Sequence, residues 1–139
     1  RLTLAIALYL LGEVEAAQQV AMLSLKEAEQ HELLRVIARS QRLLGRILAL
    51  QGHDEEADRY FEQALEMFAR HDMRLDYARA LHGYGATLLQ RGAPDSASYR
   101  RGLRSLHEAR EIFADCNATI ELEWIERILN SPAYENVGV

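Results

Sequence analysis

The chain has 139 residues, of which 49% are hydrophobic and 27% are charged, and its formal net charge is −5 at pH 7. This composition excludes a disordered chain and predicts one folded domain with its own core. The acidic balance argues against general binding to nucleic acid or anionic lipid. No run of about 20 apolar residues predicts a membrane span. The single Cys116 leaves no internal disulfide, so we expect a cytoplasmic protein.

The first 31 residues predict a helical hairpin. Leu2–Leu11 is rich in leucine and alanine and ends at Gly12, which favours a short first helix. Glu13–Gln30 has apolar residues at helical spacing and predicts the second helix. Because the chain starts with Arg1 inside a helical pattern, we expect it to be a piece of a longer protein.

A second hairpin is predicted over residues 32–72, with helices at Glu32–Gln51 and Asp54–Arg70. Gly52 is expected to end the first of them with a positive φ. Asp54 is expected to cap the second, because an aspartate accepts hydrogen bonds from free backbone N–H groups there. Gly45 leaves a place without a side chain where the two helices can approach closely.

These hairpins repeat, because Gly12, Gly52 and Gly92 stand forty residues apart. The second hairpin resembles the tetratricopeptide repeat (TPR), whose signature spacing is matched by Gly45, Leu48, Gly52, Ala57, Phe61 and Ala64. It departs from the family at Gln41, where a large apolar residue is usual, and in having no proline after Phe68. The step is longer than the usual period of about 34 residues. In this it is similar to arrays of bacterial signalling ATPases and transcription activators.

The resemblance implies an all-α, right-handed superhelix of about three hairpins. The third hairpin covers residues 73–116 and breaks the step, because Ala93–Ser98 is turn-like and five extra residues precede Gly102. Residues 118–130 predict a helix that caps the last open apolar face, so residues 1–130 form a single repeat domain. Residues 131–139 have no pattern, and we expect a loose tail.

No set of residues in the sequence predicts catalysis, a cofactor or a metal. His31–Arg35 resembles a zinc-protease helix, but Arg35 stands at the second ligand position and cannot bind a metal. Gly83–Gly85 lacks both the third glycine and the preceding strand of a nucleotide fingerprint. Cys116 has no local signature of a nucleophile. We therefore expect a protein that is not an enzyme.

Four arginines at steps of four, three and four form a stripe on the predicted helix Glu32–Gln51: Arg35, Arg39, Arg42 and Arg46. When the repeats are overlaid, the same columns hold Arg79, His82, Trp124 and Arg127. The family resemblance implies that these columns line a concave groove, which would bind an acidic partner through bidentate arginine contacts. In the alternative interpretation arginine is simply the preferred cation here, and Glu32, Asp76 or Glu123 neutralises the stripe.

We therefore expect a protein–protein interaction module whose groove binds a protein or peptide. Two alternatives stay open. The chain could be a ligand-sensing or autoregulatory segment of a larger bacterial signalling ATPase or transcription regulator, or it could associate with copies of itself through apolar ends. A second basic cluster, Arg100, Arg101 and Arg104, is expected on an outer face as a solvated surface.

Overall fold

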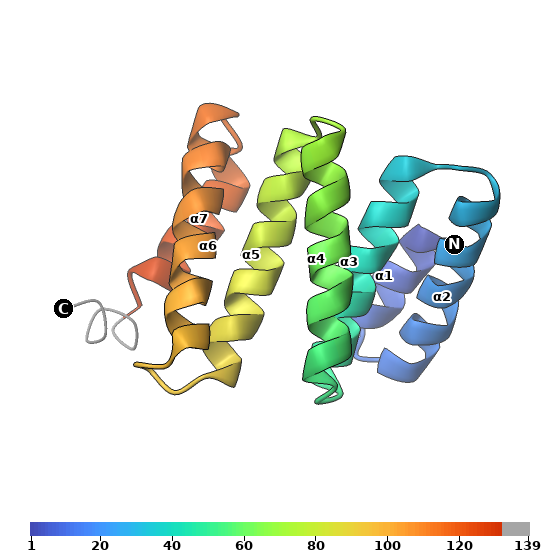
Figure 1. Cartoon of the computed structure of the whole chain (residues 1–139), viewed down its shortest axis with the longest axis horizontal. Coiled ribbons are helices and arrows are strands. Elements are labelled where there is room, and N and C mark those ends of the chain that lie inside the picture. The colour runs from blue at the N-terminus through green and yellow to red at the C-terminus, as the bar shows by residue number, and fades with distance from the viewer. Residues whose placement is uncertain (132–139) are drawn as a thin grey trace. The chain divides into compact units, whose positions relative to one another are not determined.

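The computed structural model describes residues 1–131, so the predicted loose tail lies outside the described residues except for Ser131. Within residues 1–131 the chain forms seven α-helices and no β-strand, which confirms the all-α prediction (Figure 1). The helices are α1 (Leu2–Leu10), α2 (Val14–Gln30), α3 (Leu34–Leu50), α4 (Asp54–Arg70), α5 (Arg74–Arg91), α6 (Ala97–Asp115) and α7 (Thr119–Leu129).

The helices belong to two compact units. Unit 1 runs from Arg1 to Asp72 and contains α1 to α4, while unit 2 begins at Met73 and contains α5 to α7. The boundary between them falls where the sequence predicts the third hairpin to begin.

In unit 1, α3 is the central helix, because it packs against α1, α2 and α4. Its buried apolar side chains recur at helical spacing and occupy more than half of the circumference of the helix. They are Ile37, Ala38, Leu43, Leu44, Ile47 and Leu48. Gly45 allows α4 to approach, since a Cβ at this position would lie 2.8 Å from the ring of Phe61. The close approach predicted at Gly45 is therefore confirmed.

One polar pair lies inside unit 1. The hydroxyl oxygens of Ser24 on α2 and Ser40 on α3 are 3.1 Å apart, and both residues are buried. A buried hydroxyl without a partner is costly, so each serine satisfies the other. Gln41, which replaces the large apolar residue usual in the TPR family, is half-buried and donates from Nε2 to Oε1 of Gln63 at 3.4 Å.

The turns of unit 1 repeat as the sequence predicts. Gly12 and Gly52 have φ values of +83° and +81°, which a residue without a Cβ adopts at little cost. The next N–H after each glycine, from Glu13 or His53, donates back to the carbonyl of Leu8 or Leu48 at 2.9 Å. This is the Schellman arrangement, which satisfies carbonyls at the helix end.

A second set of turns repeats without glycine, and its left-handed backbone was not predicted. Glu32, Asp72 and Asn117 follow α2, α4 and α6 and have φ values of 52°, 55° and 56°. Left-handed backbone costs a non-glycine residue about 1–2 kcal/mol. Asparagine and aspartate tolerate this conformation better than other residues, but Glu32 does not share that advantage.

Unit 2 is built around a close crossing of α5 and α6. A Cβ at Gly102 would lie 2.8 Å from the carbonyl oxygen of Gly85, and a Cβ at Gly85 would lie 3.0 Å from that of Gly102. The two backbones therefore meet at two glycines. α7 packs against α6 and buries Ile125 completely, so a helix does form where the capping helix is predicted.

One local prediction is wrong. Asp54 is the first residue of α4 and not its N-cap, a position held by His53, whose side chain makes no capping hydrogen bond. Gly92 follows α5 with extended backbone, φ −99° and ψ 151°, unlike Gly12 and Gly52. The five-residue insertion explains this, because α5 leads into a longer turn, after which the Ser96 side chain accepts from the N–H of Tyr99 at 3.1 Å and caps α6.

Among residues 1–131, no helix combines the length and the apolar character needed to cross a bilayer.

Candidate functional site

The arginine stripe lies on α3 of unit 1. At 100° per residue, its four arginines occupy a wedge about 60° wide, and this wedge faces away from the buried residues of the helix. Arg35 and Arg46 are exposed, whereas Arg39 and Arg42 are half-buried. Half-burial of an arginine places its methylene stem against apolar neighbours. Unit 1 therefore presents four cations along one side of its central helix.

Tyr9 of α1 anchors one end of the stripe. The guanidinium carbon of Arg46 lies 5.2 Å from the centroid of the Tyr9 ring, within the range of a cation–π interaction. The contact is possible because α1 packs directly against α3. It holds the guanidinium plane in place and puts an aromatic and apolar edge beside the charges. Tyr9 is a site residue that sequence reasoning missed. The forty-residue step aligns Arg46 with Ile6 of α1, three residues before Tyr9.

In unit 2 the aligned residue Arg79 is paired with acidic groups. Its Nη2 donates to Oε1 of Glu121 on α7 at 3.0 Å, and its Nη1 lies 3.8 Å from Oδ1 of the buried Asp76. Asp76 therefore neutralises Arg79, as the alternative interpretation of the basic columns expects. Glu121, and not the predicted Glu123, is the second acidic partner. Arg79 joins α5 to α7 and is not an uncompensated cation.

Glu121 also has a perturbed pKa. Hydrogen bonding from its own backbone N–H near the start of α7 lowers the pKa of the carboxyl group, and the hydrogen bond from Arg79 lowers it further. His82, a half-buried residue on α5, acts in the same direction through its charge. The ring of His82 also meets that of Phe113 edge-on at 6.4 Å, so its position is fixed by packing within unit 2.

The last two predicted groove residues lie on α7 of unit 2. Trp124 is 52% exposed, and Arg127 is also exposed. Arg127 lines a shallow depression of about 610 Å³ together with Glu123, Glu126, Asn130 and Ser131. Two carboxylates therefore accompany this arginine. Of the eight predicted groove residues, unit 1 brings four together as one basic stripe. In unit 2, Arg79 pairs with acidic groups, His82 meets Phe113, Arg127 lies beside two carboxylates, and Trp124 is exposed.

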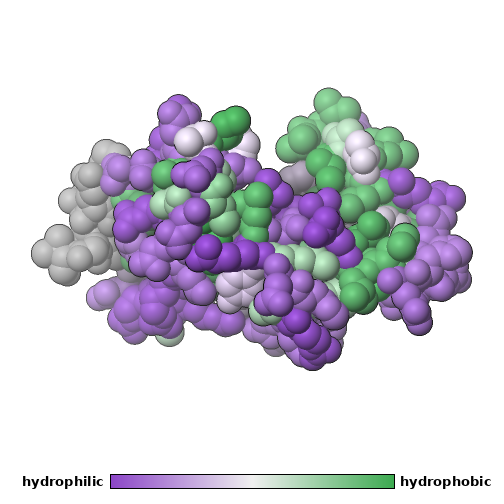
Figure 2. Space-filling view, turned by 90° about the horizontal axis from the view of Figure 1, so that it is seen from above, coloured by the Kyte–Doolittle hydropathy of each residue, from purple (hydrophilic) through white to green (hydrophobic). Residues whose placement is uncertain are grey.

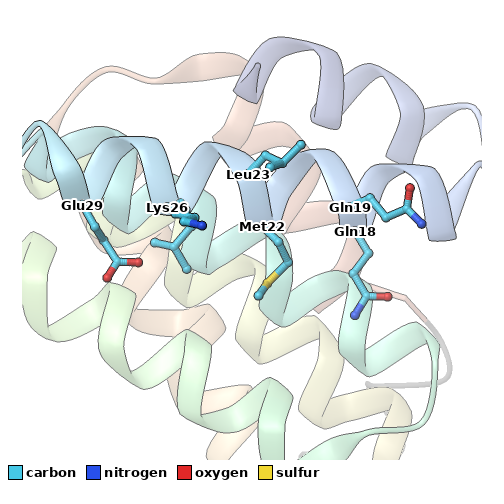
Figure 3. A pocket seen from close by; sticks show the side chains of 7 residues that line it. Gln18, Gln19, Met22, Leu23, Lys26 and Glu29 are labelled. Atoms are coloured by element: carbon cyan, nitrogen blue, oxygen red, sulfur yellow. The ribbon is translucent and has the colours of Figure 1, made fainter.

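A separate depression runs along α2 of unit 1 (Figure 3). It has a volume of about 640 Å³, and Gln18, Met22, Lys26 and Glu29 are among its lining residues. The hydroxyl of Tyr60 on α4 contacts Sδ of Met22 at 3.8 Å. Burial and the charges of Glu56 and Glu29 raise the pKa of the Tyr60 hydroxyl. None of the stripe arginines lines this depression.

The second basic cluster lies on α6, as predicted. Arg100 donates from Nη1 to the backbone oxygen of Asp95 at 3.1 Å, and Arg101 lies over the Tyr84 ring at 5.1 Å. All three arginines of this cluster, which includes Arg104, are exposed. Within the described part of the chain, no three His, Cys, Asp or Glu side chains are placed to hold a metal ion.

No family model, curated protein or solved structure matches this chain.

Proposed function

We propose that the chain is an interaction module that binds an acidic peptide segment through the arginine stripe of α3. The observation that carries this proposal is the placement of four arginines on one side of the central helix of unit 1, with Arg46 stacked on Tyr9. Arginine forks match carboxylates geometrically, and two parallel N–H···O bonds give both strength and direction. The apolar edge at Tyr9 adds a preference for a ligand with an apolar side chain beside its carboxylates.

We further propose that the hairpins are TPR-like repeats stacked in a right-handed superhelix. The repeated turns support this proposal, since Gly12 and Gly52 share one conformation, and Glu32, Asp72 and Asn117 share another. In such a stack no hairpin shields its own apolar face, and the surface shared by successive first helices becomes the binding surface. α3 is the first helix of its hairpin.

The decisive experiment reverses two charges of the stripe. Arg42→Glu with Arg46→Glu removes two arginines and sets two carboxylates against an acidic ligand. A hydrogen bond to a charged group contributes about 1.5–3 kcal/mol. Loss of two such bonds therefore weakens binding at least about 100-fold. Binding of a fluorescein-labelled peptide of Glu, Ser and Gly, followed by fluorescence anisotropy, measures this change.

The matched control is Arg100→Glu with Arg104→Glu on α6. It has the same four-residue spacing, and both double variants change the formal charge from −5 to −9, because two charges of +1 become −1. The proposal predicts that only the α3 variant loses binding and that wild-type affinity falls as salt screens the charges. Equal losses in both variants would show a nonspecific effect of net charge. Unchanged affinity in the α3 variant would refute the proposal.

A second peptide tests the apolar edge. When leucines replace some of the serines, we expect tighter binding to the wild-type chain and less gain with Tyr9→Ala. Circular dichroism of each variant checks that helicity is retained.

A further inference from the structure

The arginine stripe of α3 changes character at its C-terminal end. α3 carries four arginines and no acidic residue, and the last of the four is Arg46. The residues that follow, Ile47 to Leu50, are all apolar. Leu50 is 61% exposed, although α3 packs against α1, α2 and α4. An exposed leucine therefore follows the cations on the same helix.

Leu50 continues the line of the stripe. Arg42, Arg46 and Leu50 stand at steps of four residues, so each lies about one turn further along the helix and about 40° further around it. One such step advances about 6 Å along the axis. Side chains of a helix lean toward its N-terminus, so the side chain of Leu50 covers the turn that leads back to Arg46. Two cationic positions and one apolar position consequently form a row.

The apolar end of this row has a second member on α1. Tyr9 is half-buried and packs against the core of unit 1, so its ring is held beneath the guanidinium of Arg46. A cation–π contact uses no hydrogen bond, so it leaves the N–H groups of Arg46 able to meet a carboxylate. Figure 2 shows that hydrophobic surface over the N-terminal part of unit 1 is bordered by hydrophilic residues. A ligand of mixed acidic and apolar character fits such a border.

The spacing of the row matches the side chains of an extended peptide. On one side of an extended chain, successive side chains are two residues apart, or about 6.6–6.8 Å, which is close to the 6 Å step of the row. A helical ligand normally docks through an apolar stripe at least about 100° wide. The arginine stripe is cationic and only about 60° wide, so it suits a chain that presents a single line of side chains.

The dipole of α3 favours one placement of the acidic residues. The N-terminal end of a helix attracts negative charge, and the C-terminal end repels it. Arg35 lies in the first turn of α3, whereas Leu50 is its last residue. Carboxylates are therefore favoured toward Arg35 and disfavoured beside Leu50, where an apolar side chain can lie without loss.

We propose that the row recognises a spaced pattern in an extended peptide: two acidic residues two positions apart, and a large apolar residue two positions further on. The two carboxylates meet Arg42 and Arg46, and the apolar side chain packs on Leu50 beside Tyr9. This inference rests on the proposed function of the stripe and adds the order and spacing of the ligand residues. Because the spacing is the same in both chain directions, the pattern is acidic–x–acidic–x–apolar or its reverse.

Three labelled peptides with blocked ends test the spacing. The parent has the core Glu-Ser-Glu-Ser-Ser, the second has Glu-Ser-Glu-Ser-Leu, and the third has Glu-Ser-Glu-Leu-Ser, which has the same composition as the second but turns its leucine to the other side of the chain. Each core is flanked by Gly-Ser and is also made in reverse order. In fluorescence anisotropy with the wild-type chain, the second peptide binds about fivefold more tightly than the parent in at least one order, because part of a leucine side chain is buried. The third gains less than about twofold.

Two neutral variants test the place of the leucine. Leu50→Gln removes the fivefold gain of the second peptide and leaves the affinity of the parent peptide unchanged. The matched control is Leu33→Gln, which changes another exposed leucine, 50% exposed, at the N-cap of the same helix. The control keeps the full gain. Neither variant alters the net charge, and circular dichroism checks that both retain helicity.

The outcomes separate this inference from the proposed function. If the parent peptide binds through Arg42 and Arg46, but leucine gives the same gain at both positions or keeps its gain with Leu50→Gln, the proposed function stands and the spacing is overturned. If the parent peptide does not bind, the proposed function fails and the inference fails with it. Nuclear Overhauser effects between the leucine methyls of the second peptide and Leu50 or Tyr9 test the placement without any substitution. Effects to Leu33 instead would overturn it.

Discussion

Gly102→Ala tests the backbone crossing that holds unit 2 together. In an exposed helix interior the change from glycine to alanine is stabilising by about 1 kcal/mol, because glycine loses more backbone entropy on folding. At Gly102 the added Cβ would meet the oxygen of Gly85 at 2.8 Å, Cβ of Leu88 at 3.1 Å and the backbone nitrogen of Leu89 at 3.2 Å. Two of these three atoms belong to the α5 backbone, so no single side chain can rotate away.

The magnitude follows from the two opposing effects. Forcing an extra carbon into a well-packed helix contact costs about 1–3 kcal/mol. Taking about 3 kcal/mol for a contact against rigid backbone and subtracting the gain of about 1 kcal/mol leaves a net loss of about 2 kcal/mol. For a unit of this size, each kcal/mol lowers the melting temperature by about 4–8 °C. The effect is therefore large enough to measure easily.

The assay uses the only tryptophan of the chain. Trp124 lies on α7, so its fluorescence reports the unfolding of unit 2 in urea. The control Ala114→Gly lies on the exposed side of α6, one residue before its end, and should lose at most about 1 kcal/mol through helix propensity. If Gly102→Ala stabilised unit 2 by the propensity gain, or left it unchanged, the close crossing of α5 and α6 would be wrong.

Two further predictions concern buried and partly buried polar pairs. Ser24→Ala or Ser40→Ala alone leaves a buried hydroxyl unpaired and should lower the free energy of unfolding by about 1–3 kcal/mol. The double substitution should cost less than the sum of the two single ones. A double-mutant cycle in urea measures this difference, and strict additivity would contradict the pairing. Because the folded-state pKa of Glu121 is lowered, its contribution to the stability of unit 2 is present above the ordinary value of 4.5 and is lost as pH falls through the lowered value. Glu121→Gln should therefore be less stable than wild type at neutral pH, and the difference in stability should shrink as the pH falls below 4.5, as followed by Trp124 emission in urea. A difference that does not change with pH would count against the linkage.

Much of the fold of each unit could be predicted because its determinants are local in sequence. Gly12 and Gly52 end helices in the left-handed conformation as expected, and the apolar spacing of α3 and α4 places Gly45 against Phe61. The N-cap prediction failed because the exact start of a helix depends on the backbone geometry of the preceding turn. Asp54 misses the N-cap by one residue, since the preceding turn gives that position to His53.

The candidate site was predictable in part for the same reason. Spacing along one helix fixes which side chains share a face, so the stripe on α3 is present as predicted. Partners from other helices depend on how each helix is rotated about its axis, which spacing alone does not determine. Thus Glu121 and not Glu123 meets Arg79, and Tyr9 was not anticipated as the neighbour of Arg46.

The proposal that α3 binds acidic peptides is tested most directly by nuclear magnetic resonance of the arginine side-chain Nε–H groups during titration with the Glu, Ser and Gly peptide. We predict saturable shifts for the four α3 arginines, largest at Arg42 and Arg46, with Arg100 and Arg104 unmoved. Shifts confined to α6, or none at saturating peptide, would contradict the account.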